Sequence, residues 1–302
     1  MKIIIIILTN LLLFGCSESN HTEFDSTKAF ALLKAQCEIG YRIPDTPEHE
    51  KGKQHIISEL KKLSIKTELQ EFTAYSSLLK KDIKLTNIFA IIGTIDENTT
   101  AVSAHWDTRP IAEKDNNIEN RNKPILGAND GASGVAVLLE LARVLKIKES
   151  EGKLKSPVIL IFLDGEDLGL PNTAKEFCLG SKYLSYHIPE GIHISKGINI
   201  DMIGDADLIL YKEGNSHRDK KTSIIQDEIW EIGEKLYPSV FKNEVKYAIL
   251  DDHLSFIEKG IPYTDIIDFD YKYWHTTQDT PDKCSPESLQ IIGDVLVKYL
   301  CK

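Results

Sequence analysis

Apolar residues recur along this chain at two spacings, and the two patterns alternate from one segment to the next. A recurrence at every third or fourth position predicts amphipathic helices, and short apolar runs flanked by turn residues predict strands. The run PVILIFL at 157–163 is apolar throughout, as is typical of a strand buried on both faces of a sheet. The predicted helices are 26–39, 46–64, 130–147, 173–184, 220–236, 251–259 and 286–300, and the predicted strands are 66–74, 83–92, 99–104, 157–163, 197–203 and 263–268.

The alternation of these elements predicts the fold class. Strands that alternate with helices favour an α/β protein whose helices cover the two faces of a central sheet. No repeat, low-complexity stretch or Gly/Ser-rich linker interrupts the chain. We therefore expect one domain over 26–302, an α/β/α sandwich around a mixed, mostly parallel sheet.

The first residues have the character of an export signal. A lysine precedes an apolar run over 3–14, which is shorter than the ~20 residues that a membrane-spanning helix needs. The run ends in LFGC at 13–16, which resembles the lipobox of bacterial lipoproteins, where the cysteine becomes the lipidated first residue. We predict a lipoprotein signal peptide over 1–15, a flexible tether over 16–25 and an exported protein held at a membrane by acyl chains on Cys16. A plain secretory signal is the alternative.

Composition excludes several classes of protein. The 302 residues are 42% hydrophobic and 27% charged, which supports a globular core and argues against a disordered or disulfide-scaffold protein. The net charge of -10 repels phosphate backbones and argues against nucleic acid as a partner. No cysteine lies in a C-x-x-C motif, so a cysteine-based zinc or redox site is not expected. Export permits disulfides, but the sequence assigns no pairing among Cys37, Cys178, Cys284 and Cys301.

Acidic and imidazole side chains lie where the predicted strands end. In an open α/β sheet, ligands bind outside the carboxyl ends of the strands, so residues at those ends converge on one crevice. Each of these residues taken alone is weak evidence for a site. Asp130, for example, would serve equally well as a helix N-cap. Asp201 is more telling, since a carboxylate inside the apolar strand 197–203 is costly to bury unless it is paired or binds a metal. The candidate residues are His105, Asp107, Asp130, Glu166, Asp167, Asp201 and His275.

Together these residues indicate a divalent cation. Several carboxylates crowded at one sheet edge would repel one another unless a cation or shared protons offset their charge. Nitrogen and carboxylate oxygen without thiolate suit zinc, and three protein ligands with an open position are typical of catalytic zinc. Ligand type alone leaves manganese and iron open. The histidines without such a context are expected at the surface, and they are His21, His49, His55, His187, His193 and His217.

Six ordered motifs give the chain a resemblance to a known family. The motifs are HWDTRP at 105–110, ILGANDGASGVAVLLELARVL at 125–145, LIFLDGED at 160–167, NIDMIGDAD at 199–207, DDHLSFIEKGIP at 251–262 and YWHTTQDTP at 273–281. On these motifs the chain resembles the glutaminyl-peptide cyclotransferases, also called glutaminyl cyclases, which are related to the zinc aminopeptidases. The resemblance covers roughly residues 26–301 and implies a zinc-dependent, peptidase-like catalytic domain.

The resemblance implies a ligand set for the metal. One zinc ion per chain would be bound by Asp130, Asp167 and His275. In the related dinuclear aminopeptidases, the positions of His105 and Asp201 bind a second metal, and Asp130 bridges the two ions. All of these residue types are present, so the ligand set does not separate a cyclase from an aminopeptidase.

The resemblance also implies roles around the metal. Glu166 would be the general acid/base, Asp201 would form a hydrogen bond to it, and Asp251 would complete that network. Trp274 would form a wall of the pocket for the glutamine side chain, and Trp106 is a further candidate for that wall. The polar loop 111–124 and the segment 205–220 are expected to border the cleft.

Two features favour the cyclase, and two depart from its pattern. The triplet Asp-Asp-His at 251–253 stands where related peptidases commonly have Ser before Asp-His, and Trp274 directly precedes the predicted ligand His275. The usual glutamate ligand is replaced by Asp167, whose shorter side chain still supplies an oxygen. No tryptophan occurs in 168–180, where animal cyclases carry one, so part of the pocket wall is unassigned.

The activity implied is the conversion of N-terminal glutamine in peptides and proteins to pyroglutamate, with release of ammonia. The nucleophile would be the α-amine of the substrate, which is tethered to the γ-carbonyl, so no catalytic serine or cysteine is required. The alternatives are a dinuclear zinc aminopeptidase and an inactive peptidase-like ectodomain that only binds peptides.

Overall fold

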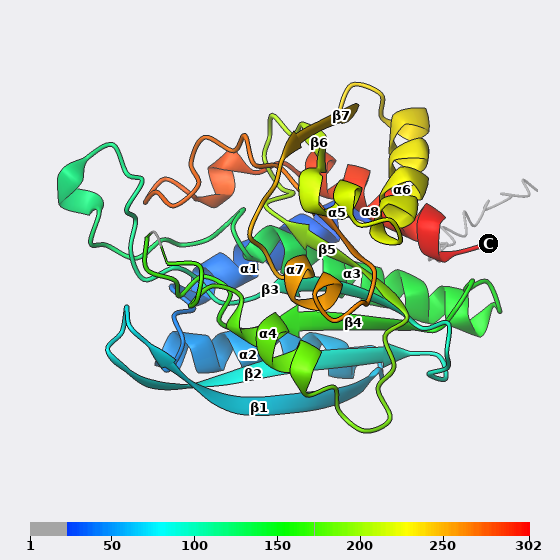
Figure 1. The fold of residues 1–302 in the computed structure, drawn as a ribbon, viewed down its shortest axis with the longest axis horizontal. Coiled ribbons are helices and arrows are strands. Elements are labelled where there is room, and N and C mark those ends of the chain that lie inside the picture. Colours follow the sequence, from blue (N-terminus) through cyan, green and yellow to red (C-terminus); the bar gives the residue numbers. More distant parts are fainter. Residues whose placement is uncertain (1–22, 172) are drawn as a thin grey trace, which may run out of the picture.

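The described part of the chain comprises residues 23–171 and 173–302 of a computed structural model (Figure 1). The predicted signal peptide 1–15 and the predicted lipidation site Cys16 lie outside the described residues. In the part that is described, no helix has both the length and the hydrophobicity needed to cross a membrane.

Helices and strands alternate along the chain in the predicted manner. The helices are α1 (Ser26–Ile39), α2 (Pro47–Lys62), α3 (Ala132–Ser150), α4 (Leu179–Tyr186), α5 (Gly214–Arg218), α6 (Thr222–Leu236), α7 (His253–Ile257) and α8 (Pro286–Leu300), with short 3-10 helices η1 (Ile118–Asn120) and η2 (Pro281–Lys283). The strands are β1 (Lys66–Ser76), β2 (Lys81–Ile92), β3 (Thr100–His105), β4 (Val158–Leu163), β5 (Lys196–Asp201), β6 (Leu210–Glu213), β7 (Phe241–Tyr247) and β8 (Tyr263–Ile267).

Six strands form the central sheet, in the order β1-β2-β4-β3-β5-β8. Strands β4, β3, β5 and β8 run parallel to one another, whereas β2 pairs antiparallel with both β1 and β4. Strands β6 and β7 form a separate parallel pair beside this sheet. The prediction of a mixed, mostly parallel sheet is therefore confirmed.

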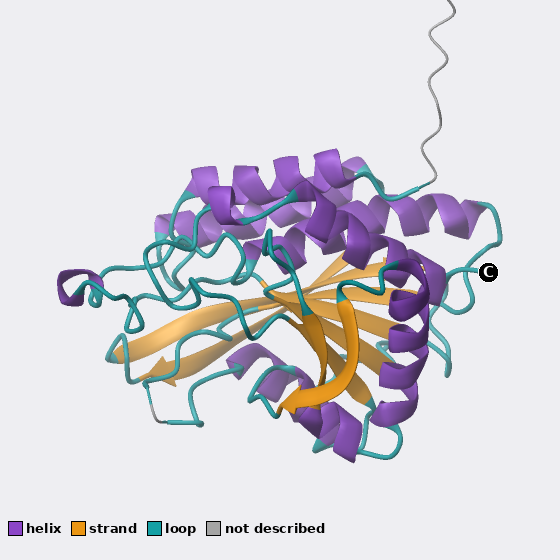
Figure 2. Ribbon diagram, turned by 90° about the horizontal axis from the view of Figure 1, so that it is seen from above, coloured by secondary structure: helices purple, strands orange, loops and turns teal. Residues whose placement is uncertain are grey.

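Helices cover both faces of the central sheet (Figure 2). Because side chains alternate along a strand, β4 contributes to two cores. Leu160 and Phe162 face the core formed with α1, α2, α3 and α8, and Ile159 and Ile161 face the core formed with α4 and α7. The apolar run in β4 thus reflects burial on both faces, and the predicted α/β/α sandwich is confirmed.

The structure differs from the predicted elements at helix α4 and at the strand pair β6 and β7, and it adds the short helices α5, η1 and η2. The helix predicted over 173–184 begins only at Leu179, because Cys178 adopts a left-handed conformation with φ 58° that no helix can continue. The pair β6 and β7 was not predicted, because β7 is largely exposed and has the polar sequence FKNEVKY without an apolar alternation.

The cysteines of the described chain are free thiols. Cys37, Cys178, Cys284 and Cys301 are all buried, and none is joined to another in a disulfide. A buried free cysteine packs as a small apolar side chain. The fold is therefore stabilised by its cores and hydrogen bonds without covalent cross-links among the described residues.

Candidate active site

The carboxyl ends of neighbouring parallel strands bring the predicted ligands together. Strand β3 ends at His105, β5 ends at Asp201, and β4 runs directly into the turn 164–167. Asp130 lies just before α3, and His275 lies in the loop between β8 and α8. The strand order β4-β3-β5 places these three ends side by side, so the convergence expected at the sheet edge is present.

Asp130, Asp167 and His275 form one group of candidate metal ligands. One donor atom from each residue lies within 4.8 Å of the other two. His275 Nε2 is 3.3 Å from Asp167 Oδ1 and 3.8 Å from Asp130 Oδ2. The Oδ2 atoms of Asp130 and Asp167 are buried and have no hydrogen-bond partner among the described residues. Because such orphaned carboxylate oxygens are costly, a divalent cation fits this group.

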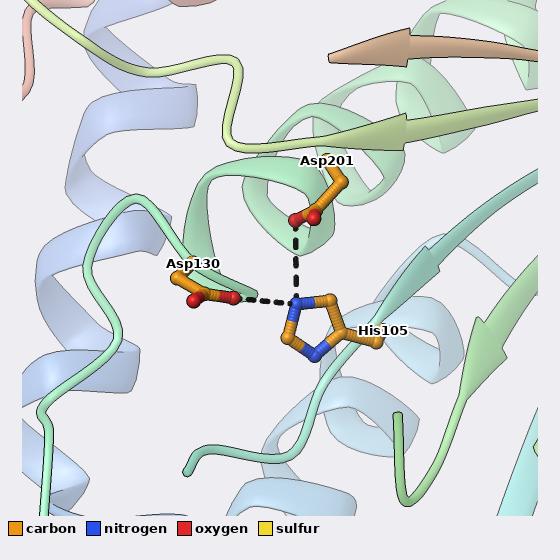
Figure 3. A group of neighbouring side chains, drawn as sticks. All are labelled: His105, Asp130 and Asp201. Carbon is orange, nitrogen blue, oxygen red and sulfur yellow. Dashed lines mark hydrogen bonds and ion pairs between the residues drawn. The ribbon is translucent and has the colours of Figure 1, made fainter. Parts of the chain in front are cut away.

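A second group shares Asp130 with the first. His105 Nε2 lies 3.0 Å from Asp130 Oδ1 and 3.3 Å from Asp201 Oδ1 (Figure 3). Asp130 therefore turns Oδ1 toward His105 and Oδ2 toward His275, as a carboxylate that bridges two ions would. The geometry accommodates one metal ion or two.

Crowding drives the pKa values of these groups apart. Burial and the charge of Asp167 raise the pKa of Asp130 to about 7. Burial disfavours the ionised form of Asp167, but His275 and Arg109 outweigh it and hold the pKa of Asp167 well below its usual range. For His275, burial lowers the pKa, but the stronger effect of Asp167 and Glu113 raises it to about 9. The centre therefore retains protons at neutral pH, which a divalent cation would replace.

Glu166 stands beside the two ligand groups. Its carboxylate is buried, and Oε1 accepts a weak hydrogen bond from Cys178 Sγ at 3.5 Å. Burial and the charge of Asp167 raise the pKa of Glu166 well above its usual range. A carboxyl group with a raised pKa is suited to take up and return a proton near neutral pH.

Asp201 and Asp251 approach the centre from β5 and from the start of α7. Asp201 Oδ1 accepts from the backbone N–H of Met202 at 2.8 Å and faces His105. No hydrogen bond joins Asp201 to Glu166 in the structure, in contrast to the prediction, and both contacts of Asp201 are made by Oδ1. One oxygen of Asp251 lies within 4.8 Å of an oxygen of Glu166. Burial and the charge of Asp201 raise the pKa of Asp251 to about 6.

Two further carboxylates fix the turns that carry the ligands. Asp107 accepts from both backbone N–H groups of 166–167, at 3.1 and 3.2 Å. Asp279 accepts from both backbone N–H groups of 129–130, at 2.8 and 3.1 Å. The sequence indicates Asp107 as a candidate site residue but assigns it no role, and it contains Asp279 only as part of the motif at 273–281. Neither role has a local sequence signal, because each depends on a contact between distant segments.

Glu113 and Arg109 hold the side chains of the ligands. Glu113 Oε1 lies 2.7 Å from His275 Nδ1. Arg109 Nη1 donates to Asp167 Oδ1 at 3.0 Å, and Arg109 Nε donates to Glu113 Oε2 at 2.7 Å. Partners of this kind orient metal ligands and set the histidine tautomer. Glu113 comes from the loop 111–124, which was expected to border the cleft.

A cavity of about 270 Å³ opens beside the ligand groups. Trp274 lines it as predicted, with its ring 4.9 Å from that of Phe269. Phe177 lines the cavity from 168–180, the segment that lacks the tryptophan of animal cyclases. The polar part of the lining consists of Asp130, Glu166, Asp201, Asp251 and His275. The cavity therefore combines the ligand groups with an aromatic wall.

Two predictions about aromatic and imidazole side chains are wrong. Trp106 does not line this cavity but is fully buried, with its indole N–H donating to the carbonyl of Thr86 at 3.2 Å. His49 is buried rather than at the surface, since it stacks on Trp106 at 4.2 Å and lies 2.9 Å from Asp164 Oδ1. Helix α2 turns His49 toward the sheet, which the helical spacing of apolar residues alone did not indicate.

The fold and its site define an α/β protein with a cluster of carboxylate and imidazole ligands at the carboxyl edge of the sheet. The profile of Peptidase family M28 matches residues 87–300, and the chain belongs to that family. A crystal structure of Bacteroides thetaiotaomicron glutaminyl cyclase bound to N-acetylhistamine has a TM-score of 0.86 and 32% identity, over 92% of this chain and 98% of that chain.

Two other comparisons describe the breadth of these similarities. A Zn-dependent exopeptidase from Parabacteroides distasonis has a TM-score of 0.86 and 29% identity, over 92% of this chain and 98% of that chain. The glutaminyl-peptide cyclotransferase of Dictyostelium discoideum is 24% identical in an alignment that covers 96% of this chain and 88% of that protein. The resemblance to glutaminyl cyclases and zinc exopeptidases that the motifs indicated is confirmed.

Proposed function

We propose that this protein is a zinc-dependent glutaminyl-peptide cyclotransferase. It converts the N-terminal glutamine of peptides and proteins to pyroglutamate and releases ammonia. The observation that carries this proposal is the position of Glu166, which lines a cavity with an aromatic wall together with Asp130 and His275 of the ligand group. The similarity to a bacterial glutaminyl cyclase at 32% identity supports it.

Zinc is the cofactor that this donor set suits. Asp130, Asp167 and His275 would hold one ion per chain, since they supply two carboxylates and one imidazole and leave a coordination position open. When bound, the ion supplies a Lewis acid for the γ-amide oxygen of the substrate glutamine. The orphaned oxygens of Asp130 and Asp167 support this assignment.

Glu166 acts as the general acid/base of the proposed reaction. The α-amine of the substrate attacks its own γ-carbonyl carbon, so a new C–N bond forms and the bond to the γ-amide nitrogen breaks. Glu166 takes the proton from the attacking amine and returns it to the departing ammonia. Because the nucleophile is tethered to its target, orientation in the cavity replaces a bimolecular encounter.

The aromatic wall supports cyclisation over hydrolysis. Trp274, Phe269 and Phe177 line the cavity with apolar surface. Such a surface binds the methylene groups of the glutamine side chain and limits the access of water, which would compete as a nucleophile. Asp251 and Asp201 also line the cavity and form part of its polar surface near Glu166.

A dinuclear aminopeptidase is the second candidate function. The observation that favours it is the intact group of His105, Asp130 and Asp201, which offers a place for a second ion. Two ions held by these residues would supply Lewis-acid activation of water for hydrolysis. The aromatic wall of the cavity and the similarity to curated glutaminyl-peptide cyclotransferases make the aminopeptidase the weaker proposal.

One experiment separates these functions. Ammonia release from a Gln-initiated dipeptide is measured before and after dialysis against a chelator, together with hydrolysis of Leu- and Ala-anilides and the metal content. We expect ammonia release, its loss on chelation, recovery with Zn²⁺ and one zinc per chain. Two metal equivalents with anilide hydrolysis would instead establish an aminopeptidase. The absence of both activities from metal-loaded protein would indicate a peptide-binding ectodomain.

Replacement of Glu113 tests how the metal ligand is held. We expect Glu113→Gln to weaken zinc binding by about 10- to 100-fold, because His275 loses the carboxylate that orients its ring. The measurement is zinc affinity by competition with a chromophoric chelator. Glu119→Gln on the same loop is the matched control, since Glu119 is exposed. Equal affinities in both variants would show that Glu113 does not orient His275.

The proposed location rests on the sequence alone. We propose that the protein is exported and held at a membrane through lipidated Cys16, with the catalytic domain on the periplasmic or cell-surface side. In the native bacterium, Cys16→Ser should move the protein from the membrane fraction to the soluble fraction and abolish labelling by an alkyne-tagged fatty acid. Unchanged membrane association and labelling would refute lipidation at this cysteine.

A further inference from the structure

Cys178 contacts the proposed general base, although no motif assigns it a role. The residue is fully buried, and Cys178 Sγ lies 3.5 Å from Glu166 Oε1. Throughout the described part of the chain, no other group forms a hydrogen bond to the Glu166 carboxylate. Among the described residues, the thiol is therefore the only donor to this carboxylate.

The backbone around Cys178 also joins the two segments. Cys178 N–H donates to the carbonyl of Glu166 at 2.8 Å, and Leu179 N–H donates to the carbonyl of Gly165 at 3.0 Å. Ser181 Oγ donates to the Cys178 carbonyl at 3.2 Å. Cys178 holds φ at 58°, a conformation that non-glycine residues keep only where the surrounding structure enforces it. The result of this conformation is a side chain directed at Glu166.

A thiol has the chemistry that this position needs. Burial, with the nearby charge of Glu166, raises the pKa of the Cys178 thiol well above its usual range, so the group remains a protonated donor. A thiol is also a weaker donor than a hydroxyl. It can thus fix the orientation of Glu166 without strongly stabilising the ionised carboxylate, which must remain able to accept a proton.

We propose that Cys178 is a positioning residue for Glu166. The Cys178 thiol fixes Oε1 by its hydrogen bond, so that the other carboxylate oxygen is directed to the cavity that Glu166 lines. A glutamate side chain has several rotatable bonds, and a displacement of about 1 Å at a reacting group can cost on the order of 10²-fold in rate. This inference rests on the proposed cyclase function and on the role of Glu166 in it.

The test compares variants that keep or remove the donor. We expect Cys178→Ala and Cys178→Gly to lower kcat for a Gln-initiated dipeptide about tenfold, with KM and zinc content within about twofold of the wild-type values. The glycine variant suits the left-handed backbone, so it removes the thiol without adding strain. Cys178→Ser keeps a donor and should recover kcat to within about threefold.

The control separates this role from the loss of any buried thiol. Cys301→Ala is the matched control, because Cys301 is also a buried free thiol. Its backbone forms a β-bridge with Leu154, near the amino end of β4 and away from the site. We expect Cys301→Ala to leave kcat unchanged. Wild-type kcat in either donor-free variant, or an equal loss in the serine variant, would overturn the inference. If the wild-type enzyme releases ammonia but the Cys178 variants give either of these results, only the inference about Cys178 fails. A wild-type enzyme that releases no ammonia would refute the proposed function itself.

Discussion

Glu166→Gln is expected to abolish ammonia release while leaving the metal bound. The amide has nearly the same shape as the carboxylate but cannot take the proton from the substrate amine, and positioned acid/base groups contribute about 10² to 10⁴ in rate. Glu166 is outside the group formed by Asp130, Asp167 and His275, so zinc content should equal that of the wild-type protein. The measurements are kcat on a Gln-initiated dipeptide and zinc per chain by elemental analysis.

The control for this variant is a glutamate of the same type away from the cavity. Glu190 is exposed in the connection after α4, and Glu190→Gln should retain full activity. A Glu166→Gln enzyme that keeps more than about a tenth of wild-type kcat would remove Glu166 from the acid/base role. A variant that loses its zinc would show instead that Glu166 supports the metal.

His275→Asn and His105→Asn are expected to differ sharply. His275 belongs only to the group with Asp130 and Asp167, and His105 belongs only to the group with Asp130 and Asp201. If one zinc occupies the first group, His275→Asn should lose both zinc and turnover, whereas His105→Asn should retain its zinc. Asparagine tolerates the left-handed conformation of His275, where φ is 54°, so the comparison avoids added backbone strain.

The readout for this pair is zinc per chain after dialysis, together with ammonia release and the melting temperature. Asp252→Asn alters a buried carboxylate next to Asp251 but outside both ligand groups, so it shows the effect of changing a buried polar group alone. Loss of one of two zinc equivalents in each histidine variant would establish a dinuclear centre. Retention of zinc in His275→Asn would show that the first group does not hold the metal.

The sequence predicted the architecture well because it rests on long, strongly patterned segments. The run in β4 and the helix α3 are apolar over most of their length, and their burial follows directly. The strands β6 and β7 were not predicted because β7 is mostly polar and shows no alternation of apolar residues. The two strands pair only once the chain has folded. Helix α4 begins later than the apolar spacing predicts, because the left-handed backbone of Cys178 prevents the helix from including the residues before Leu179.

The candidate site was predictable where a residue ends a strand. His105 and Asp201 are the last residues of β3 and β5, so topology alone brings them to one edge. Phe177, Glu113 and Asp279 come from loops, whose paths depend on contacts between distant segments. The same limit applies to Asp201, whose observed partners differ from the predicted one. Pairwise side-chain contacts of this kind need the folded structure.

The backbone clamps described for Asp107 and Asp279 bear on how the protein gains and loses its ion. Each carboxylate grips the main chain of a ligand-bearing turn through two N–H groups, independently of any ion. The cradle is thus assembled by the polypeptide itself, unlike small zinc modules whose folding requires the metal. A chain whose ligand-bearing turns are held by its own hydrogen bonds can lose and regain its ion without unfolding.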